Sequence, residues 1–122
     1  MNNPVIWFEI YVQDMPRAKA FYESVFKLKL ERLENTDMEM WAFPMEMERV
    51  GAGGALAKMD GVASGRNSTL VYFSCEDCSI EAAQVTSHGG SVSREKTSIG
   101  QYGFMALVVD TEGNMIGLHS LK

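Results

Sequence analysis

The chain has little of what membrane, secreted and nucleic-acid-binding proteins need. Its two cysteines, Cys75 and Cys78, are too close in sequence to staple a fold. No apolar run approaches the roughly 20 residues that span a bilayer, and the first residues lack the basic and apolar regions of a signal peptide. The eleven lysines and arginines are scattered, and a formal net charge of −5 argues against binding to a phosphate backbone. We therefore expect a cytoplasmic protein that binds neither membranes nor nucleic acids.

What the sequence does contain is one pattern that occurs twice: an apolar strand, an aspartate and then a helix. The strand at 6–12 leads to Asp14 and a helix at 15–26, and the strand at 70–75 leads to Asp77 and a helix at 78–88. The two aspartates lie 63 residues apart in a chain of 122, which is about half its length. The sequence therefore predicts a single domain made of two modules, at about residues 1–60 and 68–122.

Each module is expected to place its helix against one face of a sheet. In the first strand an aliphatic face alternates with a second face that carries Trp7, Glu9 and Tyr11. Asp14 and Asp77 are good helix N-caps, and further extended stretches follow each helix. The expected fold class is therefore α+β, with each half arranged as βαβββ.

The Cys75–Cys78 pair forms a C-x-x-C motif at the start of the second predicted helix. Such a motif supports redox chemistry or metal binding where a thiol pKa is depressed. However, Cys75 is expected to face the helix, and no second cysteine pair or nearby histidine completes a tetrahedral zinc site. The pattern favours a small apolar residue and an incidental thiol.

Glu9 and His119 are the polar residues of most interest for chemistry. Glu9 lies in mid-strand between Trp7 and Tyr11, on the face opposite the aliphatic one. If that face is partly dry, the pKa of Glu9 would rise and it could transfer protons; if it is open to water, Glu9 is a solvated carboxylate. His119, at the end of the last predicted strand, is either a cavity group or a surface residue.

The two strand–aspartate–helix units resemble the vicinal oxygen chelate superfamily, the group of glyoxalases, bleomycin-resistance proteins and extradiol dioxygenases. The matching stretches are residues 8–22, 71–77 with Gly89–Gly90, 99–104 and 110–119, and the resemblance covers essentially the whole chain. Within the superfamily the chain most resembles an uncharacterised glyoxalase-like branch. The resemblance implies two tandem βαβββ modules with curved mixed sheets that form a shared cavity, where enzymatic members hold a divalent metal.

At the positions where the resemblance places metal ligands, this chain has no donor side chains. The positions fall on Trp7, Leu70, Gly117 and near Ala55, whereas transition ions need imidazole, thiolate or carboxylate donors. The resemblance thus implies a protein without a metal cofactor. An apolar cavity of this kind suits a mostly hydrophobic ligand anchored by a few polar groups.

The leading hypothesis is a metal-independent small-molecule binding protein of the glyoxalase/bleomycin-resistance type. A homodimer is also expected, from the exposed aromatic and methionine content and from the habit of the superfamily. Two alternatives stay open: a metal-free isomerase or lyase with Glu9 as general base, and a divalent-metal glyoxalase or dioxygenase with Glu9 and His119 as atypical ligands. The predicted ligand-binding residues are Trp7, Glu9, Tyr11, Trp41, Leu70, Tyr72, Tyr102, Gly117 and His119.

Overall fold

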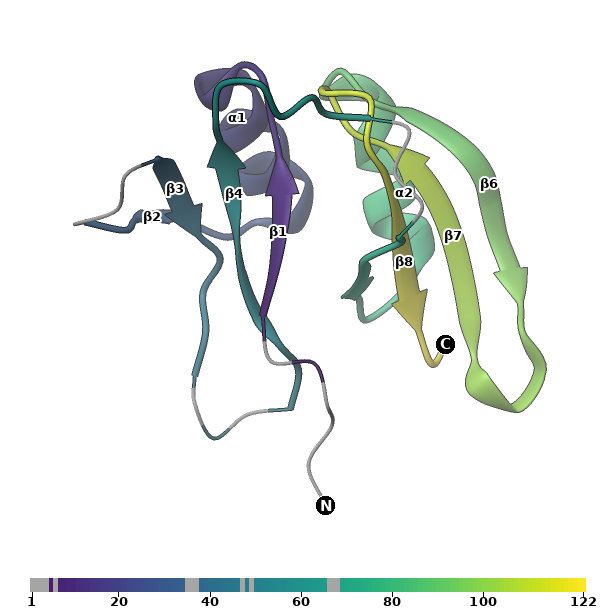
Figure 1. Cartoon of the computed structure of the whole chain (residues 1–122). Helices are drawn as coiled ribbons and strands as arrows, with labels where there is room; N and C mark the ends of the chain where they lie inside the picture. The colour runs from purple at the N-terminus through teal and green to yellow at the C-terminus, as the bar shows by residue number, and fades with distance from the viewer. Residues whose placement is uncertain (1–4, 6, 35–37, 47, 49, 66–68) are drawn as a thin grey trace.

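A computed structural model describes residues 5, 7–34, 38–46, 48, 50–65 and 69–122. It contains two βαβββ modules, which confirms the predicted α+β fold class (Figure 1). The predicted beginnings of the two units, Ile6 and Ser68, lie outside the described residues. The first module consists of β1 (Trp7–Tyr11), α1 (Met15–Phe26), β2 (Glu31–Arg32), β3 (Glu39–Ala42) and β4 (Gly53–Lys58). The second consists of β5 (Tyr72–Ser74), α2 (Cys78–Ser87), β6 (Ser91–Ser98), the short 3₁₀ helix η1 (Gly100–Tyr102), β7 (Phe104–Val109) and β8 (Met115–Ser120).

Each module has its own mixed four-stranded sheet, with strand orders β1-β4-β3-β2 and β5-β8-β7-β6. The first strand of each module pairs in parallel with the last, and the other pairs are antiparallel. The two sheets stand side by side with the helices behind them, so they do not close around one cavity (Figure 1). The reason is that the modules meet through their helices and edge strands, which leaves the opposite face of each sheet without a covering layer among the described residues.

Helix α1 has the bounds that the sequence predicts. The Asp14 carboxylate accepts a hydrogen bond from the Arg17 N–H at 3.1 Å, and Pro16 lies in the first turn, where its missing N–H costs little. The helix ends at Lys27, whose φ of 54° is left-handed. The residues that recur at helical spacing are buried: Met15, Ala18, Phe21, Tyr22 and Val25.

Helix α2 begins where predicted and ends one residue earlier. Asp77 caps it by accepting from the Ser79 N–H at 3.0 Å, and it also accepts from Lys96 of β6 at 2.9 Å. The hydrogen bonds from Lys96 and Ser79 lower the pKa of Asp77 to about 2. His88 already leaves the helix, and Gly89 turns the chain with a φ of 94° that favours glycine. The second half therefore repeats the capping device of the first.

A common hydrophobic core joins the two modules. The ring of Phe73 in β5 stacks on Phe26 of α1, with centroids 4.6 Å apart, and lies 6.3 Å from the ring of Phe8 in β1. The same core cluster includes fully buried residues of both helices and of β7 and β8. Because neither helix packs only on its own sheet, the modules share one interior. No helix in the described part of the chain is long and apolar enough to cross a membrane.

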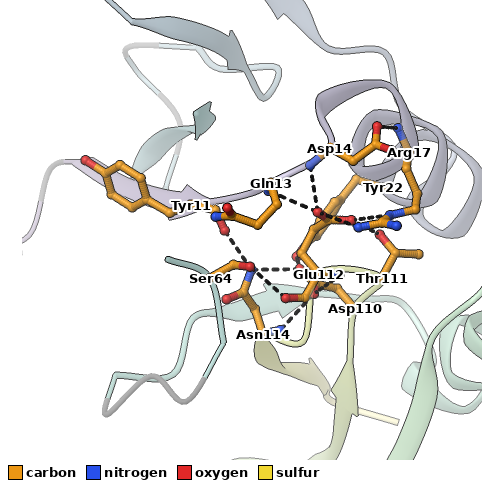
Figure 2. A network of polar contacts seen from close by, with 10 residues as sticks. All are labelled: Tyr11, Gln13, Asp14, Arg17, Tyr22, Ser64, Asp110, Thr111, Glu112 and Asn114. Carbon is orange, nitrogen blue, oxygen red and sulfur yellow. Dashed lines mark hydrogen bonds and ion pairs between the residues drawn. The ribbon is translucent and has the colours of Figure 1, made fainter. Parts of the chain in front are cut away.

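The turn between β7 and β8 anchors the second module to the first through Glu112 (Figure 2). The Glu112 carboxylate accepts from the N–H groups of Gln13 and Asp14 at 3.0 and 2.9 Å, and from the Arg17 guanidinium at 2.7 and 3.0 Å. Burial of this carboxylate opposes ionisation, but the hydrogen bonds from Arg17 and the two backbone groups outweigh it and lower the pKa of Glu112 to about 2. An ionised, fully buried side chain therefore fixes the β1–α1 junction.

The same turn holds Tyr22 and the end of β1. Asp110 accepts from the Tyr22 hydroxyl at 2.7 Å and from the N–H groups of Glu112 and Asn114 at 2.8 Å each. Burial and the Asp110 carboxylate raise the pKa of Tyr22 well above its usual value, so the hydroxyl stays a donor. The Asn114 amide donates to the Tyr11 carbonyl at 3.0 Å, while the Tyr11 side chain points away from the network (Figure 2). The position of β1 is thus set by residues about 100 positions later in the sequence.

Candidate functional site

A cleft of about 630 Å³ lies at the boundary of the modules, between the edge strand β1 and the β5–β8 pair. We call it the seam cleft. Five of the predicted ligand-binding residues are brought together there: Trp7, Glu9, Tyr11, Leu70 and Tyr72. Its other lining residues are mostly apolar: Val5, Phe8, Ile10, Ala52, Ala63, Gly65, Thr69, Val71, Asn114, Met115 and Ile116.

Glu9 is held between two aromatic donors on the open face of β1. The strand period places Trp7, Glu9 and Tyr11 on the same side, and the backbone is fixed by parallel pairing with β4. Trp7 Nε1 lies 3.2 Å from one carboxylate oxygen of Glu9, and the Tyr11 hydroxyl lies 2.8 Å from the other. The hydrogen bond to Glu9 raises the pKa of Tyr11, so its hydroxyl remains protonated. The carboxylate is exposed to solvent, but its orientation is set by both neighbours.

Tyr72 separates the seam cleft from a second cleft. Tyr72 pairs in register with Gly117 of β8, and its ring lies directly over that glycine. A Cβ added to Gly117 would come within 2.3 Å of the Tyr72 ring, so no side chain fits there while the ring keeps its place. Gly117 therefore contributes to the site as the floor beneath an aromatic ring. The ring itself is half exposed and lines both clefts.

The second cleft, of about 450 Å³, lies on the open face of the second sheet. We call it the β8 cleft; its lining residues are Tyr72, Phe73, Ser74, Ile99, Tyr102, Met105 and His119. His119 Nε2 lies 2.7 Å from the Tyr102 carbonyl oxygen, which can only accept, so Nε2 donates this hydrogen bond. Tyr102 and His119 are thus brought together, but Glu9 lines the other cleft.

Two of the predicted residues line neither cleft: Gly117, which lies beneath the Tyr72 ring, and Trp41. Trp41 belongs to β3. It pairs with Leu56 of β4 and faces α1, where Lys19 Nζ lies 3.3 Å from the centre of its ring. Its Nε1 donates to Glu39 at 3.0 Å. The sequence did not define the limits of β3, so the period of two could not assign Trp41 to a face.

The residues at the positions where the family resemblance places metal ligands do not fit a metal ion. Trp7 and Leu70 line the seam cleft, Gly117 lies under Tyr72, and Ala55 is fully buried in β4. None of the four has an imidazole, thiolate or carboxylate group in its side chain, and the indole N–H of Trp7 has no lone pair for a metal ion. Elsewhere in the described ranges, no three His, Cys, Asp or Glu side chains are grouped to hold an ion.

The C-x-x-C motif is not arranged for thiol chemistry. Burial, with a further contribution from Glu81, raises the pKa of Cys75 to about 12. At neutral pH the Cys75 thiol is therefore protonated, and the neighbouring Cys78 side chain is fully buried. These environments fit the incidental thiols that the sequence favours.

Among the lining residues of the seam cleft that sequence reasoning missed, three come from the end of the β7–β8 turn and the start of β8: Asn114, Met115 and Ile116. They follow the β7–β8 turn, and only the parallel pairing of β8 with β5 carries them to the boundary with β1. The only sequence feature that marks these residues is a polar residue ahead of a strand. That pattern is typical of any turn, so it does not indicate a binding site. A further hollow of about 690 Å³ is lined by the segment before β4 and by the first residue of that strand: Pro44, Met45, Glu46, Val50, Gly51, Ala52 and Gly53.

The sequence and the fold were compared with those of known proteins. The family profile described as "Glyoxalase/Bleomycin resistance protein/Dioxygenase superfamily" matches residues 5–118. No curated protein sequence gives a significant match.

Among solved structures, a hypothetical protein from S. aureus is similar with a TM-score of 0.73 and 17% identity over 98% of this chain and 95% of that one. The fosfomycin resistance protein FosX from Listeria monocytogenes has a TM-score of 0.71 and 13% identity, covering 98% of this chain and 91% of that one. A glyoxalase I mutant from Zea mays has a TM-score of 0.73 and 21% identity over 97% of this chain. The present chain spans 46% of the maize chain, about half its length.

Proposed function

Because the chain belongs to the glyoxalase/bleomycin resistance protein/dioxygenase superfamily, we propose that it binds a small molecule in the seam cleft and needs no metal ion to do so. The observation that carries this proposal is the convergence of Trp7, Glu9 and Tyr72 on one cleft of about 630 Å³. That volume lies within the range of about 300–1,000 Å³ for small-molecule sites. The donor-free residues at the ligand positions support the metal-independent part of the proposal.

The composition of the seam cleft favours a flat, mostly apolar ligand. Trp7 and Tyr72 remain 36% and 50% exposed, although aromatic rings of this size gain much from burial. Most other lining residues are apolar, and the polar groups are few and fixed in place. Such a site supplies a hydrophobic contact area together with a small number of orienting groups.

The first test uses the fact that the chain has two tryptophans, of which only Trp7 lines the seam cleft. In a Trp41→Phe variant the tryptophan emission comes from Trp7, and a bound aromatic ligand should change it. The same ligand at 100 times its Kd should stabilise the fold by about 2.7 kcal/mol in a thermal-shift assay. Trp7→Ala should weaken binding by at least about tenfold, because it removes an aromatic contact. Equal affinity in Trp7→Ala and Trp41→Phe would contradict the proposed site.

We also propose that the chain forms a homodimer through the open faces of its sheets. Support comes from apolar side chains that are exposed on or beside the face of the second sheet, among them Tyr72, Ile99 and Tyr102. Light scattering at micromolar concentration should then give twice the chain mass of 13.6 kDa. Tyr102→Glu should shift the mass toward that of one chain, because a charge would be buried without a partner. A wild-type mass of one chain would refute the dimer.

We further propose that the chain is a single domain, with modules at about residues 1–60 and 68–122. We also propose that the protein is located in the cytoplasm. The common core and the Glu112 anchor support the single domain. Cys75 and Cys78 are both free thiols, which supports a reducing compartment.

A further inference from the structure

We propose that the ligand of the seam cleft is an organic cation: an aromatic or otherwise apolar molecule that carries an ammonium or a similar positive group. This inference rests on the proposed function, since it names the chemical class that the same cleft would select. It depends on the charge of the lining, on how Glu9 is held, and on the rings around it.

The only charged side chain among the described lining residues of the seam cleft is negative. Among the described residues that line the seam cleft, Glu9 is the only acidic one, and no lysine, arginine or histidine is present. Among the described lining residues, a negatively charged ligand would therefore meet a carboxylate with no compensating cation, which costs free energy in a partly apolar site. The formal net charge of −5 also disfavours the approach of negatively charged ligands, at longer range.

Glu9 is oriented before any ligand arrives. Trp7 Nε1 donates to one oxygen at 3.2 Å, and the Tyr11 hydroxyl donates to the other at 2.8 Å. A carboxylate offers about four lone-pair sites, so each oxygen keeps acceptor capacity after these two bonds. Since an ionised carboxylate only accepts, the partner that completes it is a hydrogen-bond donor or a positive charge, and the charged partner interacts more strongly.

The rings next to Glu9 complement a cation as well. Trp7 and Tyr72 line the same cleft from opposite modules, and Tyr11 lies beside the carboxylate. The face of an aromatic ring attracts a cation within about 6 Å, most strongly when the ring is that of tryptophan. Aromatic side chains around a single carboxylate are the arrangement that favours ammonium groups over neutral groups of the same shape.

The test compares three probes with the same ring: a 2-naphthylethyl trimethylammonium salt, 2-(2-naphthyl)ethanol and 3-(2-naphthyl)propanoate. Calorimetry on the full chain should show the ammonium binding at least about tenfold more tightly than the alcohol, with the propanoate weakest. Glu9→Gln should remove that preference, so that the ammonium and the alcohol bind with affinities within about twofold of each other. Glu95→Gln is the matched control, because it removes an equal charge from the exposed strand β6 and should preserve the preference.

The possible outcomes separate this inference from the proposed function. Equal affinities for all three probes, or a preference that persists in Glu9→Gln, would overturn the cation inference and leave small-molecule binding in place. Binding of none of the three would overturn both. The ammonium preference should also fall as the salt concentration rises, because part of it is Coulombic.

Discussion

Replacing Glu112 with alanine is expected to lower the free energy of unfolding by about 3–5 kcal/mol, because hydrogen bonds to a charged group are worth about 1.5–3 kcal/mol each and several are lost together. The substitution removes the acceptor for the N–H groups of Gln13 and Asp14 and for the Arg17 guanidinium, all at once. Buried N–H groups that lose their acceptor keep their full desolvation cost. Urea unfolding followed by circular dichroism would measure the loss. An alanine variant as stable as the wild type would show that this turn does not anchor the modules.

Glu112→Gln is the matched control, since it keeps an amide oxygen for the backbone donors but removes the charge. Its loss should be smaller, about 2 kcal/mol, because half-exposed Arg17 is screened by solvent. The pKa of Glu112 is depressed to about 2 from 4.5, so its charge stabilises the fold fully above pH 4.5. The advantage of the wild type over Glu112→Gln should therefore shrink as the pH falls from 4.5 toward 2. A difference that stays constant over that range would contradict the ionised anchor.

Gly117→Val is expected to weaken ligand binding in the seam cleft by at least about tenfold, the usual effect of losing one well-packed aromatic contact. The ring of Tyr72 occupies the space that the new side chain needs, with a Cβ-to-ring distance of 2.3 Å. The ring must leave its place, and such overpacking also costs about 1–3 kcal/mol of stability. Titration of Trp7 emission in the Trp41→Phe background would measure the affinity, and thermal unfolding would measure the stability.

A double variant tests whether the effect of Gly117→Val acts through Tyr72. In Tyr72→Ala the ring is absent, so adding Gly117→Val should cost little further stability or affinity. If the two changes were simply additive, the new valine would be acting on some other neighbour. Wild-type affinity in Gly117→Val alone would show that the ring is not part of the binding surface.

Much of the fold could be predicted because its signals are local. Asp14, Pro16 and the apolar spacing after them define the bounds of α1, and the match between Asp14 and Asp77 reveals the second module. These features depend on neighbours within four residues. The short strand β2 and the limits of β3 depend on pairing with distant strands, and the sequence did not define them. The strand predicted at 70–75 is present as the shorter β5.

The candidate site was partly predictable for the same reason. Strand parity placed Trp7, Glu9 and Tyr11 on one face, and their side chains do lie together. The alternation of side chains along one strand does not predict which residues of another module lie near that face. For this reason the predicted ligand-binding residues left out Asn114, which lines the seam cleft, and included Trp41, which packs against Lys19 of α1. The sequence also predicted one shared cavity, whereas the structure has two clefts, because the angle between the sheets is set by the helix contacts and the Glu112 anchor.

Tyr72 lies between the seam cleft and the β8 cleft, so the position of its ring affects the volume of both. The Tyr72 ring lines both clefts, so a ligand that displaced the ring away from one cleft would reduce the volume of the other. A ligand in either cleft would then lower the affinity of the other cleft by the same factor, because both ligands act on the position of one ring. If ligands occupied both clefts, this one side chain would couple them negatively without any movement of the backbone.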